Sequence, residues 1–184
     1  MTVPADALVF DTGPLRHFAA QGWLAVLRFL AAGRAVYIPE AVEDELRRAS
    51  EHNPTLGAVL NAEWITVHRA TDVAYLATFA SYESRLAVGR TNLGECGVLA
   101  MGEVYGCEIV IDDNTARQVA KEKGLRVIAT VPLLCDAVRT KQLTLVMVEK
   151  LADDLLASEY FLPFEAGGFR RHVIENGLLD YDDS

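Results

Sequence analysis

Aspartates follow two short apolar segments of the chain at the point where each segment ends. Asp11 comes directly after residues 7–10, and Asp112 and Asp113 come directly after residues 109–111. Apolar runs of this length predict buried strands, and parallel sheets bind ligands at the carboxyl ends of their strands. If the two strands are neighbours, the aspartates share one crevice.

A glutamate lies beside the apolar face of the helix predicted after Pro39. At about 100° per residue, Glu45 falls on the shoulder of the apolar stripe, which consists of Val42, Leu46 and Ala49. The other acidic residues of this helix are expected on the opposite side, and they are Glu40, Glu43 and Asp44. Glu45 therefore points towards the interior, unless it only pairs with Arg48 three residues later.

A second glutamate lies at the centre of an inward helical face. Glu95 falls between Val98 and Leu99 on the helix predicted from Asn92 to Gly106. A buried lone carboxylate is costly, so this position needs a partner. The alternative is a capping box, in which Asn92 and Glu95 only satisfy backbone donors.

Acidic groups gathered in one place predict a divalent metal site. Two carboxylates about 4 Å apart repel by about 4 kcal/mol at an effective dielectric near 20. Hard oxygen ligands suit Mg²⁺ or Mn²⁺, and such an ion activates water for attack on a phosphodiester. Local alternatives remain, because Asp11 could end its strand in a turn, and Asp113 or Asn114 could cap a helix.

The elements that would position these residues alternate between strand and helix. Strands are predicted at 7–10, 35–38, 64–68, 108–111 and 126–129. Helices are predicted at 14–33 with a break near Gly22, 39–49, 53–62, 71–86, 92–105, 115–123, 131–140 and 145–158. Strand–helix alternation predicts an α/β fold whose mostly parallel central sheet is flanked by helices on both faces.

The pattern changes after residue 142, and we predict two parts in the 184-residue chain. Residues 1–142 form the α/β domain, and residues 143–184 form a C-terminal helical extension packed on it. Residues 160–168 within the extension are rich in aromatic residues, proline and glycine.

Composition limits the classes of protein considered. The net charge of −9 weighs against nucleic acid as a partner, although acidic residues that converge on a cation would weaken that objection. The three cysteines form no C-x-x-C pair, which indicates a reducing compartment. No apolar run approaches the roughly 20 residues of a membrane span, and no signal peptide is visible. We therefore expect a cytoplasmic protein without a membrane partner.

The motifs together resemble the PIN-domain family, and within it the VapC-type toxin ribonucleases and their relatives. The matching segments occur in the order found in that family and span roughly residues 5 to 140. They are residues 9–15 (VFDTGPL), 38–46 (IPEAVEDEL), 93–95 (LGE) and 111–117 (IDDNTAR).

The resemblance implies a PIN-like three-layer fold, Mg²⁺ or Mn²⁺ as cofactor, and endonucleolytic cleavage of RNA. It implies that Asp11, Glu45, Glu95 and Asp113 are the catalytic and metal-binding residues. It also implies a cognate antitoxin that blocks the site and association into a homodimer, so that the chain is the toxin of a toxin–antitoxin pair.

The residues around this quartet extend the predicted site. The double aspartate leaves open whether Asp112 or Asp113 faces the metal, although Asp113 aligns better. Thr12, Asn114 and Arg117 are supporting or substrate-binding candidates, with Arg117 able to reach a phosphate or to pair with Asp113. Basic residues that could border the RNA are Arg16, Arg47, Arg48, Arg85, Arg90, Arg117 and Lys121.

Two other functions compete with the ribonuclease. A PIN-like interaction module with weak or no catalysis is one, although all four acidic positions are filled. A haloacid-dehalogenase-like phosphatase is the other, but it needs a second acidic residue two positions after the first. That position is Gly13.

Overall fold

Five parallel strands form one sheet in the computed structural model, which describes residues 3–87, 91–158 and 160–180. The strand order is β3-β2-β1-β4-β5. The strands are β1 (Leu8–Phe10), β2 (Val36–Pro39), β3 (Ile65–His68), β4 (Glu108–Val110) and β5 (Val127–Ile128). The sheet confirms the predicted parallel α/β fold and the order of its elements.

The central strand is apolar along its whole length because helices cover both of its faces. Leu8, Val9 and Phe10 are fully buried, as expected for a strand inside a parallel sheet. Phe10 is in register with Val110 of β4, so β1 and β4 end side by side.

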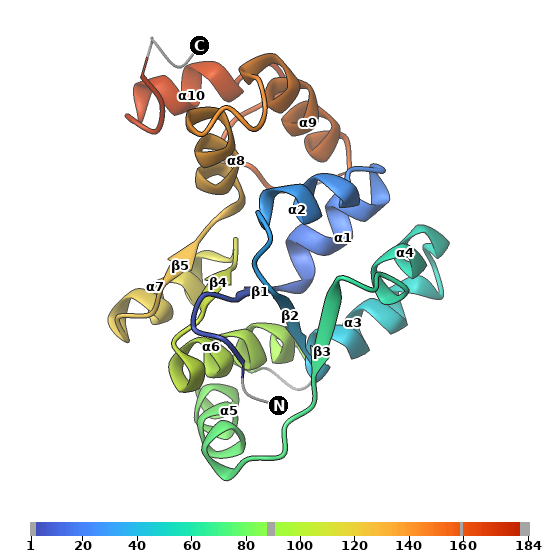
Figure 1. The fold of residues 1–184 in the computed structure, drawn as a ribbon, viewed down its shortest axis with the longest axis vertical. Helices are drawn as coiled ribbons and strands as arrows, with labels where there is room; N and C mark the ends of the chain where they lie inside the picture. Colours follow the sequence, from blue (N-terminus) through green and yellow to red (C-terminus); the bar gives the residue numbers. More distant parts are fainter. Residues whose placement is uncertain (1–2, 88–90, 159, 181–184) are drawn as a thin grey trace.

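Helices connect the strands and cover the sheet on two sides (Figure 1). Between the strands lie α1 (Thr12–Ala20), α2 (Leu24–Leu30), α3 (Glu40–Ser50), the 3-10 helix η1 (Pro54–Leu56), α4 (Gly57–Leu60), α5 (Val73–Leu86), α6 (Leu93–Tyr105) and α7 (Asn114–Glu122). Connections between parallel strands are right-handed. Helices α1 to α4 accordingly lie on one side of the sheet, and α5 to α7 lie on the other.

One helix start differs in detail from the sequence-based expectation, and one predicted break between helices is confirmed. Helix α5 begins after its cap Asp72 and not at residue 71 as predicted, because the Asp72 side chain accepts a hydrogen bond from the Tyr75 N–H at 2.8 Å. The predicted break near Gly22 is confirmed, and Gly22 has a φ of 75°, which favours glycine.

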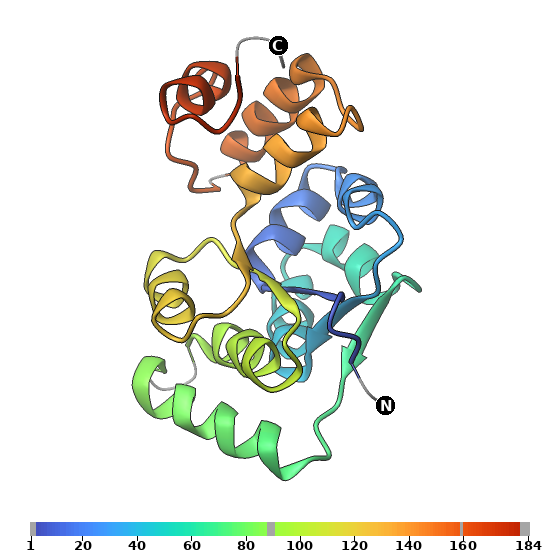
Figure 2. The same ribbon diagram turned by 60° about the vertical axis from the view of Figure 1, so that its left-hand side comes forward.

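The C-terminal helices stack at one end of the molecule (Figure 2). They are α8 (Thr130–Arg139), α9 (Leu145–Ala157) and α10 (Phe169–Glu175). Helix α10 was not predicted, although the side chains of Phe169 and Val173 on one side of it are buried. The Trp23 indole N–H donates to Asp154 at 3.1 Å and joins α9 to the start of α2. The division of the chain at residues 142 and 143 remains a prediction.

Other sequence-based expectations can be compared with the described residues. The three cysteines are free and buried. No helix in the described ranges has the length and apolar character that crossing a membrane requires.

Candidate active site

The predicted acidic residues gather where the strand order of the sheet reverses. Strands β2 and β3 follow β1 on one side, and β4 and β5 lie on its other side. The Asp11 N–H continues the ladder by donating to the Val110 carbonyl oxygen at 3.0 Å. Asp11 and the two residues Asp112 and Asp113 therefore leave adjacent strands at the carboxyl edge, where open α/β sheets bind ligands.

Asp11 carries a buried carboxylate that lacks a full set of partners. Its exposed fraction is 6%, and its Oδ1 atom has no hydrogen-bond partner among the described residues. Burial raises the pKa of Asp11 well above its usual value, and the charges of Glu95 and Glu45 raise it further. The N–H groups of Thr12 and Gly13 oppose this increase in the pKa. Asp11 thus holds an uncompensated acceptor inside an acidic cluster.

Glu45 is fixed in place by two donors from other segments. The Thr12 hydroxyl donates to Glu45 Oε2 at 2.5 Å, and the Gly94 N–H donates to Oε1 at 3.0 Å. Arg48 does not pair with Glu45, because its Nε donates to the Asp44 carbonyl oxygen at 3.2 Å. The local alternative for Glu45 is therefore wrong.

Gly94 makes the second of these bonds sterically accessible. A Cβ atom on Gly94 would lie 2.7 Å from Glu45 Oε2, which is closer than real Cβ contacts. A second glycine of α6, Gly97, would place its Cβ 2.8 Å from Pro39 Cβ. The two glycines therefore allow α6 to approach the end of β2 and the start of α3.

Glu95 lies in the first turn of α6, half-buried and beside other acids. Burial raises the pKa of Glu95, and Glu45 and Asp113 raise it further, while a backbone hydrogen bond opposes the change. The capping-box alternative is wrong, because Asn92 has a φ of 63° and caps no N–H with its side chain. The Asn92 amide donates instead to the Leu86 carbonyl oxygen at 3.2 Å.

Asp113 combines a local role with a place beside Glu95. Its Oδ1 accepts a hydrogen bond from the Ala116 N–H at 2.8 Å, so Asp113 caps α7 as the alternative interpretation proposed. Asp113 and Glu95 also line the same cavity of about 160 Å³. Capping therefore does not turn Asp113 away from the other acids.

Asp112 points to a different part of the molecule. Its Oδ1 accepts from the Thr130 N–H at 2.8 Å, and its Oδ2 accepts from the Thr130 hydroxyl at 2.6 Å and from the Tyr160 hydroxyl. Both oxygens of Asp112 thus have partners at the start of α8 and in the C-terminal segment. Of the double aspartate, only Asp113 lies with Glu95.

Sequence reasoning missed the aromatic side chain that borders this site. The Tyr160 ring is close to Asp11, because a Cβ on Gly13 would lie 3.8 Å from Tyr160 Cε2 and 3.7 Å from Asp11 Oδ2. The His17 ring stacks on the Tyr160 ring with centroids 4.4 Å apart, and His17 Nδ1 shares a hydrogen bond with the Ser158 hydroxyl. The aromatic composition of residues 160–168 indicated packing, but no local pattern identified its partner.

The predicted basic residues have different surroundings. Arg47 pairs with Glu43, and Arg85 pairs with Glu122. Arg117 donates to the side chain of Asn114 and not to Asp113. Arg90 lies outside the described residues.

The acidic cluster has the donor chemistry of a divalent cation site but not a closed cage. Among the described residues, no three His, Cys, Asp or Glu side chains are arranged to hold a metal ion by themselves. Mg²⁺ does not need such a cage, because it usually keeps several waters and binds one or two carboxylates plus substrate phosphates. The unpartnered Oδ1 of Asp11 beside Glu95 fits that kind of binding.

Comparison with known proteins adds one finding to this geometry. A family model described as a PIN domain matches residues 7–166, which includes every acidic residue considered above. No curated protein and no solved structure shows significant similarity to the chain.

Proposed function

The chain belongs to the PIN-domain family, whose members are generally nucleases, and from this premise we propose that it is a metal-dependent endoribonuclease. The proposed reaction is hydrolysis of RNA phosphodiester bonds. The proposed catalytic and metal-binding residues are Asp11, Glu45, Glu95 and Asp113. The buried and unpartnered Oδ1 of Asp11 is the observation that carries the proposal.

A buried carboxylate oxygen beside other acidic groups is unfavourable unless a positively charged group neutralises it. Asp11 is buried, and the charges of Glu45 and Glu95 act on it. No lysine or arginine forms an ion pair with these three residues within the described ranges. This arrangement supports a cation as the missing partner.

The proposed cofactor is Mg²⁺ or Mn²⁺, which Asp11, Glu45, Glu95 and Asp113 would hold. When bound, such an ion would activate water and stabilise the charge that develops on a phosphodiester oxygen. Its affinity is expected to depend on substrate, because Mg²⁺ sites of this kind share their ligands with phosphate oxygens.

The residues of the chain itself orient the acidic groups. Thr12 and Gly94 hold the two oxygens of Glu45 from opposite sides. The Ala116 N–H fixes one oxygen of Asp113, whose side chain lines the same cavity as Glu95. Orientation by such hydrogen bonds removes the need to reorganise the site during the reaction.

The test is cleavage of RNA by the purified protein. We expect cleavage with Mg²⁺ or Mn²⁺, loss of cleavage with a chelator, and loss of at least a hundredfold in rate in Asp11→Asn. The matched control is Asp44→Asn, which removes an exposed carboxylate next to Glu45 and should leave the rate within twofold of the parent. Equal rates in Asp11→Asn and the parent would reject the assignment.

The narrower assignment as the toxin of a toxin–antitoxin pair is also a proposal, and it is supported by the VapC-like order of the four motifs. It includes a cognate antitoxin, a homodimer and a cytoplasmic location. Expression in a bacterial host should arrest growth, and Asp11→Asn should relieve the arrest. Growth at the normal rate with active enzyme present would reject the toxin role.

The second candidate is a PIN-like interaction module without catalysis. The absence of a closed three-ligand cluster among the described residues is the observation that favours it. A module would bind RNA or protein but would not cleave RNA with either metal, so the same assay decides between the two. The phosphatase alternative has no support from the family comparison.

A further inference from the structure

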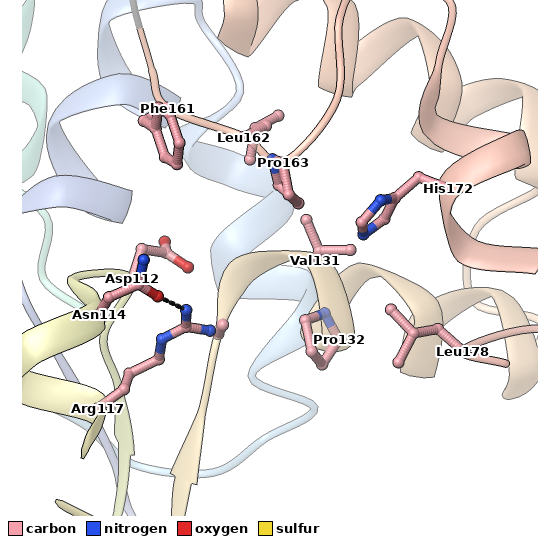
Figure 3. Close-up of a pocket in the computed structure, with 11 residues that line it drawn as sticks. Asp112, Asn114, Arg117, Val131, Pro132, Phe161, Leu162, Pro163, His172 and Leu178 are labelled. Carbon is pink, nitrogen blue, oxygen red and sulfur yellow. Dashed lines mark hydrogen bonds between the residues drawn. The ribbon is translucent and has the colours of Figure 1, made fainter. Parts of the chain in front are cut away.

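A second cavity lies next to the acidic cluster, between the α/β domain and the C-terminal segment (Figure 3). Its volume is about 220 Å³. One wall comes from residues that follow β4 and β5 and from the first turns of α7 and α8, and the other comes from residues beyond 160. The predicted extension therefore supplies five of the eleven residues that line this cavity.

The two walls differ in chemistry. Asn114 and Arg117 supply an amide and a guanidinium on one side, while Phe161 and Pro163 supply apolar surface opposite them. His172 of α10 closes the far end, and its ring points towards Val131 and Pro163 in Figure 3. A flat aromatic group with a nearby negative charge would match both walls.

Arg117 is the strongest single feature of the cavity. Its Nη2 donates to Asn114, but its Nε is buried and has no acceptor among the described residues. No carboxylate in the described ranges forms an ion pair with Arg117, although the chain carries a net charge of −9. A guanidinium that lines a cavity and has no counterion favours an anionic ligand there, and phosphate matches its geometry.

Phe161 leaves most of its side chain exposed at the cavity. Its exposed fraction is 81%, although both neighbours, Tyr160 and Leu162, are buried. In Figure 3 its ring lies above Asp112, and Phe161 is one of the residues that line the cavity. Exposed aromatic rings beside a basic group are the usual platform for bases of single-stranded nucleic acid.

Direct contacts link this cavity to the candidate active site. Asp112 lines the cavity and accepts a hydrogen bond from Tyr160, and the Tyr160 ring lies beside Gly13 and Asp11. Tyr160 therefore contacts both the cavity residue Asp112 and the surroundings of Asp11, and it directly precedes Phe161 in the chain.

We propose that this cavity is a base-binding subsite for the nucleotide next to the cleaved phosphodiester, with Phe161 stacking on the base and Arg117 contacting its phosphate. The inference rests on the proposed ribonuclease function and adds to it the origin of base selectivity. The cavity is smaller than the roughly 300–1,000 Å³ of drug-sized sites, so it suits one ring and not a whole nucleotide.

The test measures RNA binding separately from cleavage. Fluorescein-labelled eight-nucleotide RNAs of A, C or U are titrated with Asp11→Asn protein in Mg²⁺, which should bind without cutting. In this background, Phe161→Ala and Arg117→Gln should each weaken binding about five- to tenfold. Phe161→Ala should also remove the preference among the three RNAs.

The controls are the matched pair Phe29→Ala and Arg28→Gln. Both residues are exposed on α2 and line no part of this cavity. They should change RNA affinity by less than twofold. Thermal unfolding of each variant shows whether a change in affinity reflects loss of the fold.

The outcomes separate this inference from the proposed function. If the parent cuts RNA but the cavity variants bind and cut as the parent does, the inference is overturned and the ribonuclease stands. If the cavity variants lose binding while the parent never cuts, RNA binding at the cavity stands, but both catalysis and the subsite's place beside a cleaved bond are rejected. If no protein binds RNA, the cavity holds another occupant, such as an apolar side chain of a protein partner, and the inference is overturned.

Discussion

The Tyr160 hydroxyl donates a hydrogen bond to the Asp112 carboxylate and so joins the C-terminal segment to the end of β4. The same carboxylate holds the first turn of α8 through Thr130. Asp112 is thus the point where three segments meet, next to the proposed active site but with no free oxygen of its own. The two consecutive aspartates therefore differ in role. Asp112 holds neighbouring segments together, whereas Asp113 lies in the acidic cluster.

Tyr160→Phe removes this hydroxyl and leaves the ring. We expect a loss of about 2 kcal/mol in the free energy of unfolding, because hydrogen bonds to charged groups contribute roughly 1.5–3 kcal/mol. Urea denaturation measures it. Tyr37→Phe is the control, since the Tyr37 hydroxyl forms no hydrogen bond within the described residues; equal losses in both variants would show that the bond to Asp112 contributes nothing.

Gly94→Ala inserts a methyl group against Glu45. The new Cβ would lie 2.7 Å from Oε2, so α6 or Glu45 must move. We expect a loss of about 1–3 kcal/mol in stability, as for other overpacked sites, and at least a tenfold loss of RNA cleavage. Gly57→Ala, whose Cβ would meet only Asn61 at 3.9 Å, should be neutral or stabilising by roughly 0.5–1 kcal/mol. Parent-like activity in Gly94→Ala would show that the position of Glu45 does not matter.

Asp11→Asn should be more stable than the parent when a chelator is present. The substitution removes a buried charge that faces Glu45 and Glu95, and active sites often sacrifice stability in this way. We expect the melting temperature at pH 7 to rise by about 2–4 °C, the shift that 1 kcal/mol produces in a chain of this size. A lower melting temperature would mean that the carboxylate stabilises the fold without any cation.

His68 makes stability depend on pH. Tyr105 donates to Asp72 at 2.6 Å, and His68 Nε2 lies 3.1 Å from the same hydroxyl, so a neutral His68 donates to Tyr105. Burial lowers the pKa of His68 below its usual value of 6.5, and Asp72 only partly opposes this. The native state therefore binds fewer protons than the unfolded state. The contribution of neutral His68 to the free energy of unfolding is fully present above pH 6.5 and is lost as the pH falls through the lowered pKa.

His68→Gln should accordingly show a smaller loss of stability than the parent between pH 7.5 and pH 5. Urea midpoints at the two pH values provide the measurement. His52→Gln, at an exposed position, is the control and should follow the parent. Parallel curves for the parent and His68→Gln would contradict the assigned proton arrangement.

RNA affinity should fall only gently with salt. The chain is acidic overall, and several of its arginines are already paired with carboxylates. With about two or three phosphate contacts, log affinity should fall with log salt at a slope of about −1.4 to −2, since single strands give about −0.7 per contact. A slope steeper than about −4 in the Asp11→Asn protein would show a larger basic surface than the one inferred.

The order of elements was predictable because its signals are local. Apolar runs identify strands, and Pro39, Gly22 and Gly124 mark helix limits through their own backbone preferences. The helical position of Glu45 also followed from periodicity alone. These features depend on neighbours in sequence and not on the fold.

The same periodicity failed for Glu43, which was expected on the exposed side of α3. Glu43 is 9% exposed and pairs with Arg47 and Arg69. Arg69 follows β3 and covers this side of α3, a contact between distant segments that a helical projection does not contain. The contact of Tyr160 with Asp112 was missed for the same reason.

The acidic edge also depends on the order in which the chain is made. Asp11 belongs to the first strand, whereas Asp113 follows β4, which pairs with β1 only after all intervening segments exist. A nascent chain that has been synthesised only as far as α5 contains Asp11 and Glu45 but neither Glu95 nor Asp113. Any nuclease activity would therefore appear late in synthesis. An incomplete chain would lack the full acidic cluster and so could not cleave the messenger RNA from which it is being translated.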